Sequence, residues 1–498
     1  MSPAKTESAT NSEISNPPML ISLPMLIGGE PRQSGSGEFE EVINPATGDV
    51  LSRVPMCTES DVDAAVQAAV RAFPGWRETP VPQRVQVLFR LKQLLEQNFD
   101  DLARMVVREN GKTIEDARGE VRRGIEVVDF ACGMPTLMMG ETVEQIARGI
   151  DSHTVRVPLG VVAGICPFNF PAMIPLWMMP VAIAAGNAFV LNPSERTPMA
   201  GTRIAELFME AGLPPGVLNV VHGAHRTVDA LLSHPDIRAI SFVGSMPVAR
   251  YIYETSARHG KRVQALAGAK NHLIAMPDCD MDLTVKAVMS SAFGAAGQRC
   301  LAGSVLVAVG EVADPLVERL KSAASGLKIG DGLIEDSALG PVIRKDTCER
   351  VESYIEKGLA EGAKLVLDGR QSGRNPRGFF TGPTIMDHAT PEMSIAREEI
   401  FGPLLTVVRV RDLDEALEVT NRSHFGNASS IFTRSGEAAG AFRSRVEAGM
   451  CGVNIGVAAP MAFFPFAGWK SSFFGDLHAT GKDGVRFYTE TRVVIERW

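Results

Sequence analysis

The segment GAAGQRCLAGS places a cysteine where it could act as a nucleophile. Cys300 directly follows Arg299 and comes after a flexible Gly297–Gln298 step. A thiolate is a strong nucleophile, and a nearby guanidinium or an exposed backbone amide favours the charged form of the sulfur. Lone cysteines, however, are usually small apolar residues of a core. The local pattern therefore leaves two interpretations open, a catalytic thiol and a buried structural one.

A second candidate is Asn169, in the segment CPFNFP of residues 166–171. The segment follows an apolar run that predicts a buried strand, and doubly wound sheets bind ligands at the carboxyl ends of their strands. The side-chain amide of Asn169 could donate a hydrogen bond to a developing oxyanion. A proline-stiffened turn without a ligand would show the same sequence pattern.

Gly244 and Ser245 in SFVGSMPVAR form a third candidate. They lie between a predicted strand and a predicted helix, where small residues let the amides at a helix N-terminus approach a phosphate. The segment lacks the GxGxxG fingerprint of dinucleotide-binding folds. An ordinary glycine turn is therefore an equally good interpretation of these two residues.

The composition is that of a globular protein with several domains. The 498 residues correspond to about three domains of roughly 150 residues each. Hydrophobic residues make up 45% and charged residues 22% of the chain, and the formal net charge is -8. This acidic balance predicts no general attraction to nucleic acid or to an anionic membrane, so local groups must bind any anionic ligand. Seven cysteines without a CxxC pair favour the reducing cytoplasm as the location.

The order of the apolar patterns predicts an α/β fold. Apolar residues recur at helical spacing from Glu59 to Val128, which predicts a layer of three or more helices. From Val155 onward strand-like and helix-like segments alternate, and this alternation predicts a doubly wound parallel sheet. A second α/β unit begins near Asp282. The last apolar run, GVRFYTETRVVIERW, predicts a strand that can pair outside its own domain.

One stretch of the chain tests a membrane location. No charged residue occurs between Arg156 and Glu195, and this length would suffice to span a bilayer. Several prolines and the amides of Asn169 and Asn187 interrupt it, so a buried unit of strand, loop, helix and strand is the better interpretation. The nine histidines show no HExxH or paired spacing, and no metal site is predicted.

Six short motifs in a fixed order identify a resemblance. The motifs PFNFP, NPSE, SFVGS, GAKN, GQRC and EEIFGP occur in this order between residues 167 and 403. Together they resemble the aldehyde dehydrogenase superfamily. Longer segments, among them PFNFPAMIPLWMMP and SSFFGDLHATGKDGVRFYTETR, resemble its CoA-acylating methylmalonate-semialdehyde dehydrogenase branch. The similarity extends from about residue 25 to residue 498.

The resemblance implies how the chain is divided. It implies one domain that binds NAD, one that carries the catalytic cysteine, and a small element that joins subunits into a homodimer or a homotetramer. The expected units are a flexible tail (1–20), a doubly wound NAD-binding domain (21–145 and 159–275), an α/β catalytic domain (276–465) and a small β oligomerisation element (146–158 and 466–498).

The resemblance also implies a role for each candidate residue. Cys300 matches the nucleophile that attacks the aldehyde carbonyl, and Asn169 together with the backbone amide of Cys300 matches the oxyanion hole. Hydride transfer to nicotinamide then leaves a thioester on the sulfur. The residues that match positions in contact with NAD are Phe168, Asn192, Glu195, Gly244, Ser245, Glu399 and Phe401.

The chain departs from the superfamily at the position of the hydrolytic base. Hydrolytic members have a glutamate at the start of ELGGK, whereas this chain has Leu266 in LAGAK. Leucine cannot accept a proton, so attack by water on the thioester is slow, while a thiol such as coenzyme A needs less help. We therefore expect coenzyme A as a co-substrate and an acyl-CoA product. The alternatives are a hydrolytic enzyme in which another carboxylate is the base, and a catalytically silent member, against which the intact Cys300, Asn169 and Glu399 argue.

A second departure is Asn192 in LNPSE, where the family usually has a lysine that contacts the adenosine ribose. An amide can still form hydrogen bonds with the ribose hydroxyls, but it offers no charge to a 2′-phosphate. The nearby carboxylate of Glu195 would repel that phosphate. We therefore expect NAD rather than NADP as the cofactor.

Two arginines indicate the class of substrate. Arg123 and Arg299 match substrate-side positions in the CoA-acylating branch, and a guanidinium binds a carboxylate with two hydrogen bonds. The expected substrate is malonate semialdehyde or methylmalonate semialdehyde, which loses its carboxylate at the thioester stage and gives acetyl-CoA or propionyl-CoA and NADH. In the alternative interpretation Arg123 pairs with Glu120 or Glu126 on its own helix and Arg299 braces its loop. The charged residues at 108–123 are interpreted as a solvated helix face.

Overall fold

The uninterrupted apolar runs of the first α/β unit become strands that are buried on both faces. The computed structural model describes residues 21–373 and 377–498, so the expected tail at 1–20 lies outside the described residues. Strands β8 and β9 contain only buried residues, as parallel strands covered by helices on both sides do. The eight-stranded sheet has the order β22 (Phe473–Gly475), β12 (Arg262–Leu266), β11 (Ile237–Val243), β8 (Val161–Ile165), β9 (Ala188–Asn192), β10 (Leu218–Val220), β2 (Met25–Ile27) and β3 (Glu30–Arg32).

Alternate side chains of this sheet enter two different cores. Val162 of β8 packs into one hydrophobic cluster, whereas Val161 and Ala163 pack into another. Successive side chains of a strand point to opposite faces, so one strand serves both layers. The first core contains α2 (Val81–Gln97), α3 (Phe99–Asn110), α4 (Ile114–Cys132), α6 (Met173–Ala184) and α7 (Met199–Glu210), and the second contains α1 (Glu59–Glu78), α8 (His225–Ser233) and α9 (Met246–Arg258). The predicted helices are confirmed as α1 to α4; α2 to α4 lie in one layer, whereas α1 packs on the opposite face of the sheet.

The chain reverses direction across the first sheet at β8. It runs from β8 through β9 to β10 on one side and then places β11 and β12 on the other. These five strands are parallel, so their carboxyl ends share one edge of the sheet. The loops after β8 and after β11 therefore diverge and leave a crevice, the place where this class of sheet binds ligands. The predicted doubly wound fold is confirmed, with antiparallel strands added at both edges.

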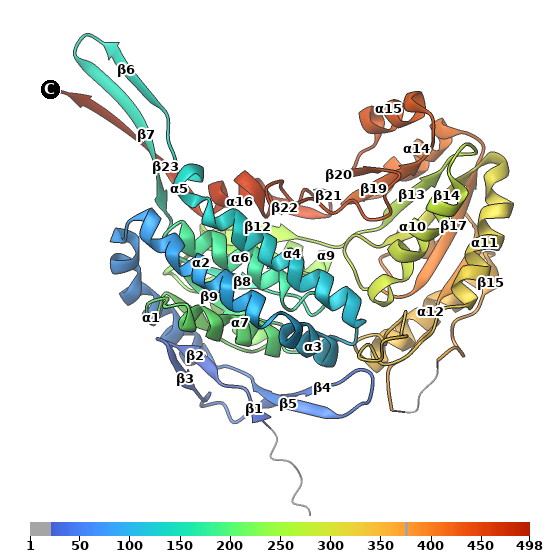
Figure 1. Cartoon of the computed structure of the whole chain (residues 1–498), viewed down its shortest axis with the longest axis horizontal. Coiled ribbons are helices and arrows are strands. Elements are labelled where there is room, and N and C mark those ends of the chain that lie inside the picture. Colours follow the sequence, from blue (N-terminus) through green and yellow to red (C-terminus); the bar gives the residue numbers. More distant parts are fainter. Residues whose placement is uncertain (1–20, 374–376) are drawn as a thin grey trace, which may run out of the picture.

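The second α/β unit is a seven-stranded sheet with helices on both faces, seen on the right of Figure 1. Its order is β15 (Lys364–Leu367), β16 (Thr384–Ala389), β17 (Leu404–Val410), β14 (Gly303–Val309), β13 (Asn271–Ala275), β19 (Ala428–Phe432) and β20 (Met450–Val453). One face packs against α10 (Met281–Phe293) and α11 (Ala313–Ser325), and the other against α12 (Lys345–Glu361), α13 (Ser394–Arg397), α14 (Leu413–Asn421) and α15 (Gly436–Arg445).

The expected boundary between the NAD-binding and catalytic domains, at residue 275, assigns strand β13 to the first domain, whereas β13 belongs to the second sheet. It pairs with β14 and β19 of the second sheet, although it follows β12 of the first sheet after only four residues. Both strands are short apolar runs, and such runs carry no signal for the sheet they will join. The chain therefore passes from the first sheet to the second at residues 267–270.

A three-stranded antiparallel sheet projects from the body as an arm (Figure 1). Its strands are β6 (Thr142–Ala147), β7 (Ile150–Pro158) and β23 (Thr489–Arg497), and β23 pairs with β7 along its whole length. The predicted pairing of the last strand outside its own domain is confirmed. Two edges of the expected element differ: β6 begins before residue 146, and β22, within 466–498, joins the first sheet instead. Three residues are too few to show a strand period in the sequence.

Smaller elements complete the chain. Strands β4 (Phe39–Ile43) and β5 (Val50–Pro55) form an antiparallel pair, and β5 also pairs with β1 (Ile21–Ser22). The remaining elements are α5 (Met134–Leu137), η1 (Gly294–Gly297), η2 (Gly310–Val312), β18 (Phe425–Gly426), β21 (Trp469–Lys470) and α16 (Gly481–Phe487). Within residues 21–373 and 377–498, no helix has the length and apolar character needed to cross a bilayer.

Asn187 ties the arm to the first sheet, and its loss should destabilise both. Its Oδ1 accepts hydrogen bonds from the amides of Leu159 (2.8 Å) and Gly160 (3.1 Å), and its Nδ2 donates to the carbonyl of Tyr488 (2.9 Å). Asn187→Ala leaves these buried groups unpaired, so we expect a loss of roughly 3 kcal/mol in the free energy of unfolding. Urea unfolding followed by tryptophan fluorescence measures it. The exposed Gln86→Ala is the control, and equal midpoints for the two variants would contradict this role.

Candidate active site

The loop after β8 brings Asn169 to the cysteine loop. Asn169 is buried, and its side-chain amide donates a hydrogen bond of 3.1 Å to the backbone oxygen of Gln298. Gln298 lies two residues before Cys300 in the chain. The structure therefore places the amide predicted for the oxyanion hole beside the segment that carries the predicted nucleophile.

Cys300 is held by its backbone rather than by its sulfur. Its carbonyl oxygen accepts hydrogen bonds from the side-chain amides of Asn271 (2.9 Å) and Asn427 (2.8 Å). The turn before it needs a glycine at Gly297, because φ there is +69° and an added Cβ would lie 2.3 Å from the backbone oxygen of Gly402. These contacts fix the cysteine while leaving the thiol free to face a ligand.

Two cavities meet at Cys300. The first has a volume of about 590 Å³ and is lined by residues of α4 and α6 and by the loop before Cys300. The second has a volume of about 870 Å³ and lies at the carboxyl edge of the first sheet. Cys300 lines both, so its sulfur stands where a ligand in one cavity can react with a ligand in the other.

The thiol of Cys300 is neutral in the resting site. Burial, together with the smaller effect of the Glu399 carboxylate, raises its pKa to about 12, and the guanidinium of Arg299 and nearby backbone amides only partly oppose this rise. All seven cysteines are free, and none forms a disulfide. The expected help from Arg299 is therefore outweighed by burial, and the sulfur must lose its proton as it attacks.

All the residues that match NAD-contacting positions line the second cavity. Helix α9 begins at its edge, and no side chain caps the free amides of its first turn. Unpaired amides at a helix N-terminus suit a pyrophosphate, so this cavity fits a dinucleotide. The NAD-matching residues in its wall are Phe168, Asn192, Glu195, Gly244, Ser245, Glu399 and Phe401. In the described parts of the chain, no cluster of three or more potential ligands could hold a metal ion.

Asn192 has only one free atom for a cofactor. Its Nδ2 donates to the backbone oxygens of Val221 and Gly223, both at 3.2 Å, which leaves Oδ1 as an acceptor. An acceptor can bind a ribose hydroxyl but not a phosphate, because an ionised phosphate has no proton to donate at this contact. Glu195 lies beside Arg196, 3.5 Å from Oε1 to Nε, so its charge is partly balanced.

Glu399 and Phe401 enclose the inner end of the second cavity. Glu399 accepts a hydrogen bond of 2.8 Å from the amide of Ala269, and burial raises its pKa to about 7. The carboxylate can approach this closely because residue 268 is glycine, where a Cβ would lie 2.4 Å from Oε2. Phe401 has a left-handed backbone (φ 56°) and packs edge-on against Phe168 at 5.9 Å. That backbone conformation is costly for a side chain of this size.

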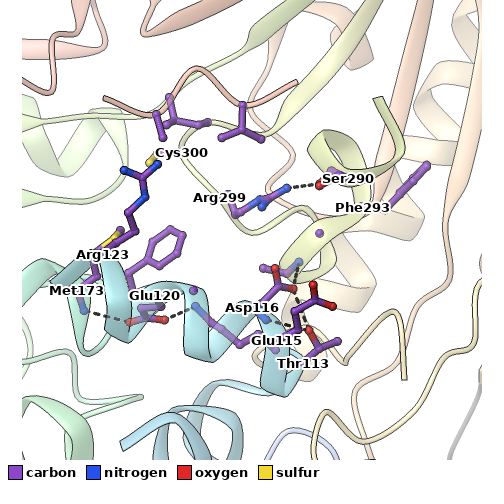
Figure 2. Close-up of a pocket in the computed structure, with 18 of the residues that line it drawn as sticks. Thr113, Glu115, Asp116, Glu120, Arg123, Met173, Ser290, Phe293, Arg299 and Cys300 are labelled. Atoms are coloured by element: carbon purple, nitrogen blue, oxygen red, sulfur yellow. Dashed lines mark hydrogen bonds and ion pairs between the residues drawn. The ribbon is translucent and has the colours of Figure 1, made fainter. Parts of the chain in front are cut away.

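The two predicted substrate arginines line the first cavity but point in different directions (Figure 2). Arg123 extends toward Cys300 and also contacts Glu126 at 3.3 Å and the carbonyl of Pro460 at 3.4 Å. Arg299 turns away toward Ser290 and donates to its backbone oxygen. The alternative interpretation describes contacts of both arginines, because Arg299 braces its loop and Arg123 pairs with Glu126 on its own helix. Arg123 nevertheless lines the cavity and remains within reach of a ligand.

Leu266 ends β12 and supplies no proton acceptor to the site. It is buried in the same hydrophobic cluster against which Cys300 packs. Its backbone oxygen accepts from the amide of Gly244 at 3.1 Å, so the residue is fixed by the sheet. The position expected to lack a base is therefore an apolar part of the core.

Lys112 and Glu120 were missed by the sequence reasoning. The charged residues at 108–123 were expected to form a solvated helix face, and for two of them this expectation is wrong. Lys112 and Glu120 are completely buried and form an ion pair of 2.5 Å. Asp116, on the same helix, accepts a hydrogen bond of 3.0 Å from the amide of Ala295 in the cysteine loop. A charge surrounded by other charges gives no sequence signal of burial, because helical spacing alone does not separate it from a surface residue.

Comparison with known proteins defines the class of this site. A profile of the aldehyde dehydrogenase family matches residues 32–494. The chain therefore belongs to the aldehyde dehydrogenase family. It is 59% identical over 473 residues to malonate-semialdehyde dehydrogenase 3 of Geobacillus kaustophilus, and the aligned region covers 95% of this chain and 98% of that protein. It is 56% identical to malonate-semialdehyde dehydrogenase of Halalkalibacterium halodurans, with 95% and 97% covered.

Solved structures agree in fold over nearly the whole chain. The crystal structure of a protein from Sinorhizobium meliloti described as a methylmalonate-semialdehyde dehydrogenase, complexed with NAD, has a TM-score of 0.95 at 46% identity and covers 97% of this chain and 99% of that one. The crystal structure of methylmalonate-semialdehyde dehydrogenase from Oceanimonas doudoroffii has the same TM-score at 48% identity, with 96% and 99% covered. The resemblance seen in the motifs is confirmed.

The neutral state of Cys300 should be visible in its alkylation. Iodoacetamide reacts with the thiolate, and with a pKa of about 12 the thiolate fraction grows throughout the neutral range. For the protein without cofactor we expect the rate at Cys300 to rise about tenfold per pH unit from about pH 7 to about pH 9. Peptide mass spectrometry follows the modified cysteine, with Cys300→Ser as the control. A plateau near neutral pH would show a thiolate already formed.

Proposed function

We propose that this protein oxidises malonate semialdehyde or methylmalonate semialdehyde with NAD and transfers the acyl group to coenzyme A with loss of the carboxylate. The observation that carries the proposal is the place of Cys300 between two cavities, one lined by the NAD-matching residues and one by Arg123. The relatives named above are malonate- and methylmalonate-semialdehyde dehydrogenases, and one solved relative is complexed with NAD.

In the first half-reaction the Cys300 sulfur forms a bond to the aldehyde carbon and releases its proton. The carbonyl oxygen becomes an oxyanion, which the side-chain amide of Asn169 and the backbone amide of Cys300 would stabilise by hydrogen bonds. Bound NAD supplies an acceptor for the hydride on that carbon. Collapse of the oxyanion to a carbonyl leaves an acyl group joined to Cys300 as a thioester.

The carboxylate of the substrate is then lost from the acyl group. In the thioester this carboxylate lies β to the carbonyl, so the bond between the carboxylate carbon and the α-carbon can break, with its electron pair passing into an enolate of the thioester. Protonation of the enolate leaves an acetyl or propionyl thioester, and the carboxylate departs as CO2. Arg123, which points toward Cys300 in Figure 2, would hold the carboxylate before it leaves.

The absence of a base at Leu266 supports coenzyme A rather than water as the final acceptor. Water needs a proton acceptor to attack a thioester, whereas a thiol attacks it readily. Attack by the coenzyme A sulfur on the thioester carbonyl forms acyl-CoA and returns the proton and the free thiol to Cys300. The buried, apolar side chain of Leu266 offers water no such proton acceptor.

We further propose that the arm joins subunits into a homodimer or a homotetramer. Apolar side chains are exposed on β6 and β23, and a β-sheet with an uncovered apolar face is a typical subunit contact. The exposed residues, with their exposed fractions, are Val143 (59%), Ile146 (49%), Val493 (62%), Ile495 (66%) and Trp498 (97%). The cytoplasm, expected from the cysteines, stays a proposal as the compartment.

Product analysis tests the proposed reaction. With NAD and malonate semialdehyde we expect NADH formation and acetyl-CoA as the product when coenzyme A is present, and little free acid when it is absent. A Leu266→Glu variant restores a carboxylate at the missing position and should gain CoA-independent turnover, with Leu266→Gln as the uncharged control. Rapid release of free acid by the parent would favour the hydrolytic alternative, and no NADH from several aldehydes would favour a silent protein.

Arg123 should determine the preference for an anionic aldehyde. Arg123→Met removes the guanidinium and should raise KM for malonate semialdehyde by roughly 10- to 100-fold, because a hydrogen-bonded charge contact is worth about 1.5–3 kcal/mol. KM for uncharged propanal should stay within about threefold. Initial rates of NADH formation measure both. The neighbouring Arg122→Met, which removes a surface pair with Glu96, is the control, and equal changes for both aldehydes would refute this role.

A further inference from the structure

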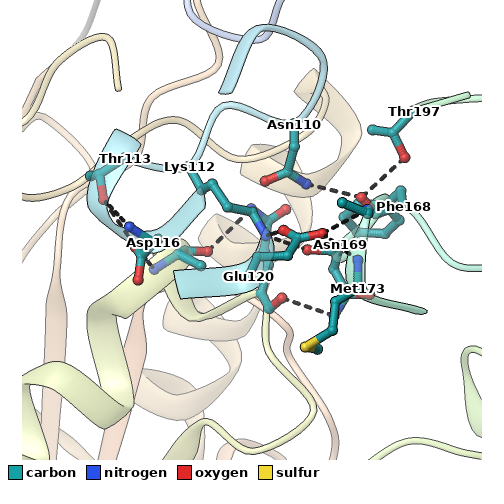
Figure 3. Close-up of polar contacts among 12 residues, drawn as sticks. Asn110, Lys112, Thr113, Asp116, Glu120, Phe168, Asn169, Met173 and Thr197 are labelled. Carbon is teal, nitrogen blue, oxygen red and sulfur yellow. Dashed lines mark hydrogen bonds and ion pairs between the residues drawn. The ribbon is translucent and has the colours of Figure 1, made fainter. Parts of the chain in front are cut away.

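The loop that carries Asn169 is held by side chains from outside it. Its two prolines have no amide to donate, and two consecutive carbonyls of the loop bind side-chain donors instead (Figure 3). The carbonyl of Phe168 accepts from Asn110 (3.0 Å) and Thr197 (3.1 Å), and the carbonyl of Asn169 accepts from the ammonium of Lys112 (2.6 Å). The position of the Asn169 backbone thus depends on Lys112.

Lys112 forms an ion pair with Glu120, which also accepts hydrogen bonds from backbone amides at the end of the loop. The Lys112 ammonium lies 2.5 Å from one carboxylate oxygen of Glu120, and the exposed fractions of the two side chains are 1% and 0%. The other oxygen accepts from the amides of Ala172 (2.8 Å) and Met173 (3.1 Å), where α6 begins. The ion pair therefore contacts the backbone on both sides of residues 170–171, through Lys112 at Asn169 and through Glu120 at the start of α6.

The helix that carries Glu120 also holds the cysteine loop. Asp116 lies four residues before Glu120 on α4, so both carboxylates project from the same side of the helix. Asp116 accepts a hydrogen bond from the amide of Ala295, whose left-handed backbone (φ 49°) opens the turn toward Cys300. One rigid helix therefore contacts the loop of the predicted oxyanion donor and the loop of the predicted nucleophile.

We propose that the buried Lys112–Glu120 pair is a positioning device that sets the distance between the Asn169 amide and Cys300. The inference rests on the proposed function, in which Asn169 stabilises the oxyanion on Cys300. A buried ion pair is often no more stabilising than an apolar pair of similar volume, so stability alone gives little reason for these two charges. Besides their ion pair, both side chains form hydrogen bonds with the backbone around Asn169. An apolar pair could not form these bonds.

A kinetic double-mutant cycle tests whether Lys112 acts through Asn169. Without coenzyme A, a single turnover with NAD and malonate semialdehyde gives a burst of NADH whose rate reports acylation of Cys300. We expect Asn169→Ala to slow the burst by roughly 10²- to 10³-fold, as loss of one oxyanion donor does. Lys112→Met should slow it by about tenfold or more, because small displacements of a catalytic group are costly. Once Asn169 is alanine, Lys112→Met should add less than about twofold, since no donor is left to position.

A matched control separates positioning from stability. Glu109 is as buried as Glu120 and likewise accepts two amides at a helix start, those of Met199 (2.7 Å) and Ala200 (2.9 Å) of α7. In the described residues it forms no ion pair with a lysine and no hydrogen bond with the loop of Asn169, although the charge of Lys112 partly opposes the rise that burial causes in its pKa. Glu109→Gln should lower the thermal unfolding midpoint and leave the burst rate within about twofold of the parent. Should Lys112→Met fail to fold, the double variant Lys112→Met/Glu120→Gln removes both charges and keeps an acceptor for the α6 amides.

The outcomes distinguish the inference from the proposed function. A burst of parental rate in the variants of Lys112, or slowing by Lys112→Met that multiplies with that of Asn169→Ala, would overturn the positioning role while the proposed reaction stands. A parent without any NADH burst would overturn the proposed function and this inference with it. Loss of the burst in Glu109→Gln to the same extent as in Lys112→Met would also overturn the positioning role, because the loss of any buried acidic or basic group in this region would then explain the effect.

Discussion

The two halves of the site come from different sheets, and chemistry at Cys300 requires that they stay in contact. Asn169 follows β8 of the first sheet, whereas Cys300 leads into β14 of the second. A donor for an oxyanion has to lie within about 0.5 Å of its productive position. Two hydrogen bonds cross between the halves at this point, from Asn169 to Gln298 and from Ala295 to Asp116. The first joins the two loops directly, and the second joins the cysteine loop to α4, so neither relies on the distant sheet edges.

Burial acts on the sulfur in two opposite ways. It raises the pKa of Cys300 to about 12 and the pKa of Glu399 to about 7, so the resting site holds a less reactive thiol and a carboxyl group that is partly protonated near neutral pH. Burial also places the sulfur against an apolar cluster, which offers no proton acceptor to water that would attack an acyl group there. With Leu266 in place of a base, the neutral thiol attacks the aldehyde more slowly, but the thioester that forms reacts slowly with water. A long-lived thioester suits transfer of the acyl group to another thiol.

Most of this site could be predicted from the sequence because its residues lie in short motifs. Each motif is a continuous segment at the end of a strand or in a loop. Cys300, Asn169 and the NAD-matching residues line the two cavities that the topology creates, although their roles stay predictions. The direction of Arg299 could not be predicted, because a side chain in a loop can turn either way. The burial of Lys112 and Glu120 was also hidden, since their charges look like those of the surface residues around them. Short strands such as β22 carry too few residues to reveal their partners.

The strands at the very end of the chain complete structures that began much earlier. Strand β22 covers the edge of β12, β23 covers β7, and Arg262 donates to the backbone oxygens of Phe487 and Thr489 around the end of α16. During synthesis on the ribosome, the first sheet must therefore wait with an open edge until the last residues emerge. An unpaired strand edge invites association with other nascent chains, so the edge of β12 is open to such association until β22 has been made.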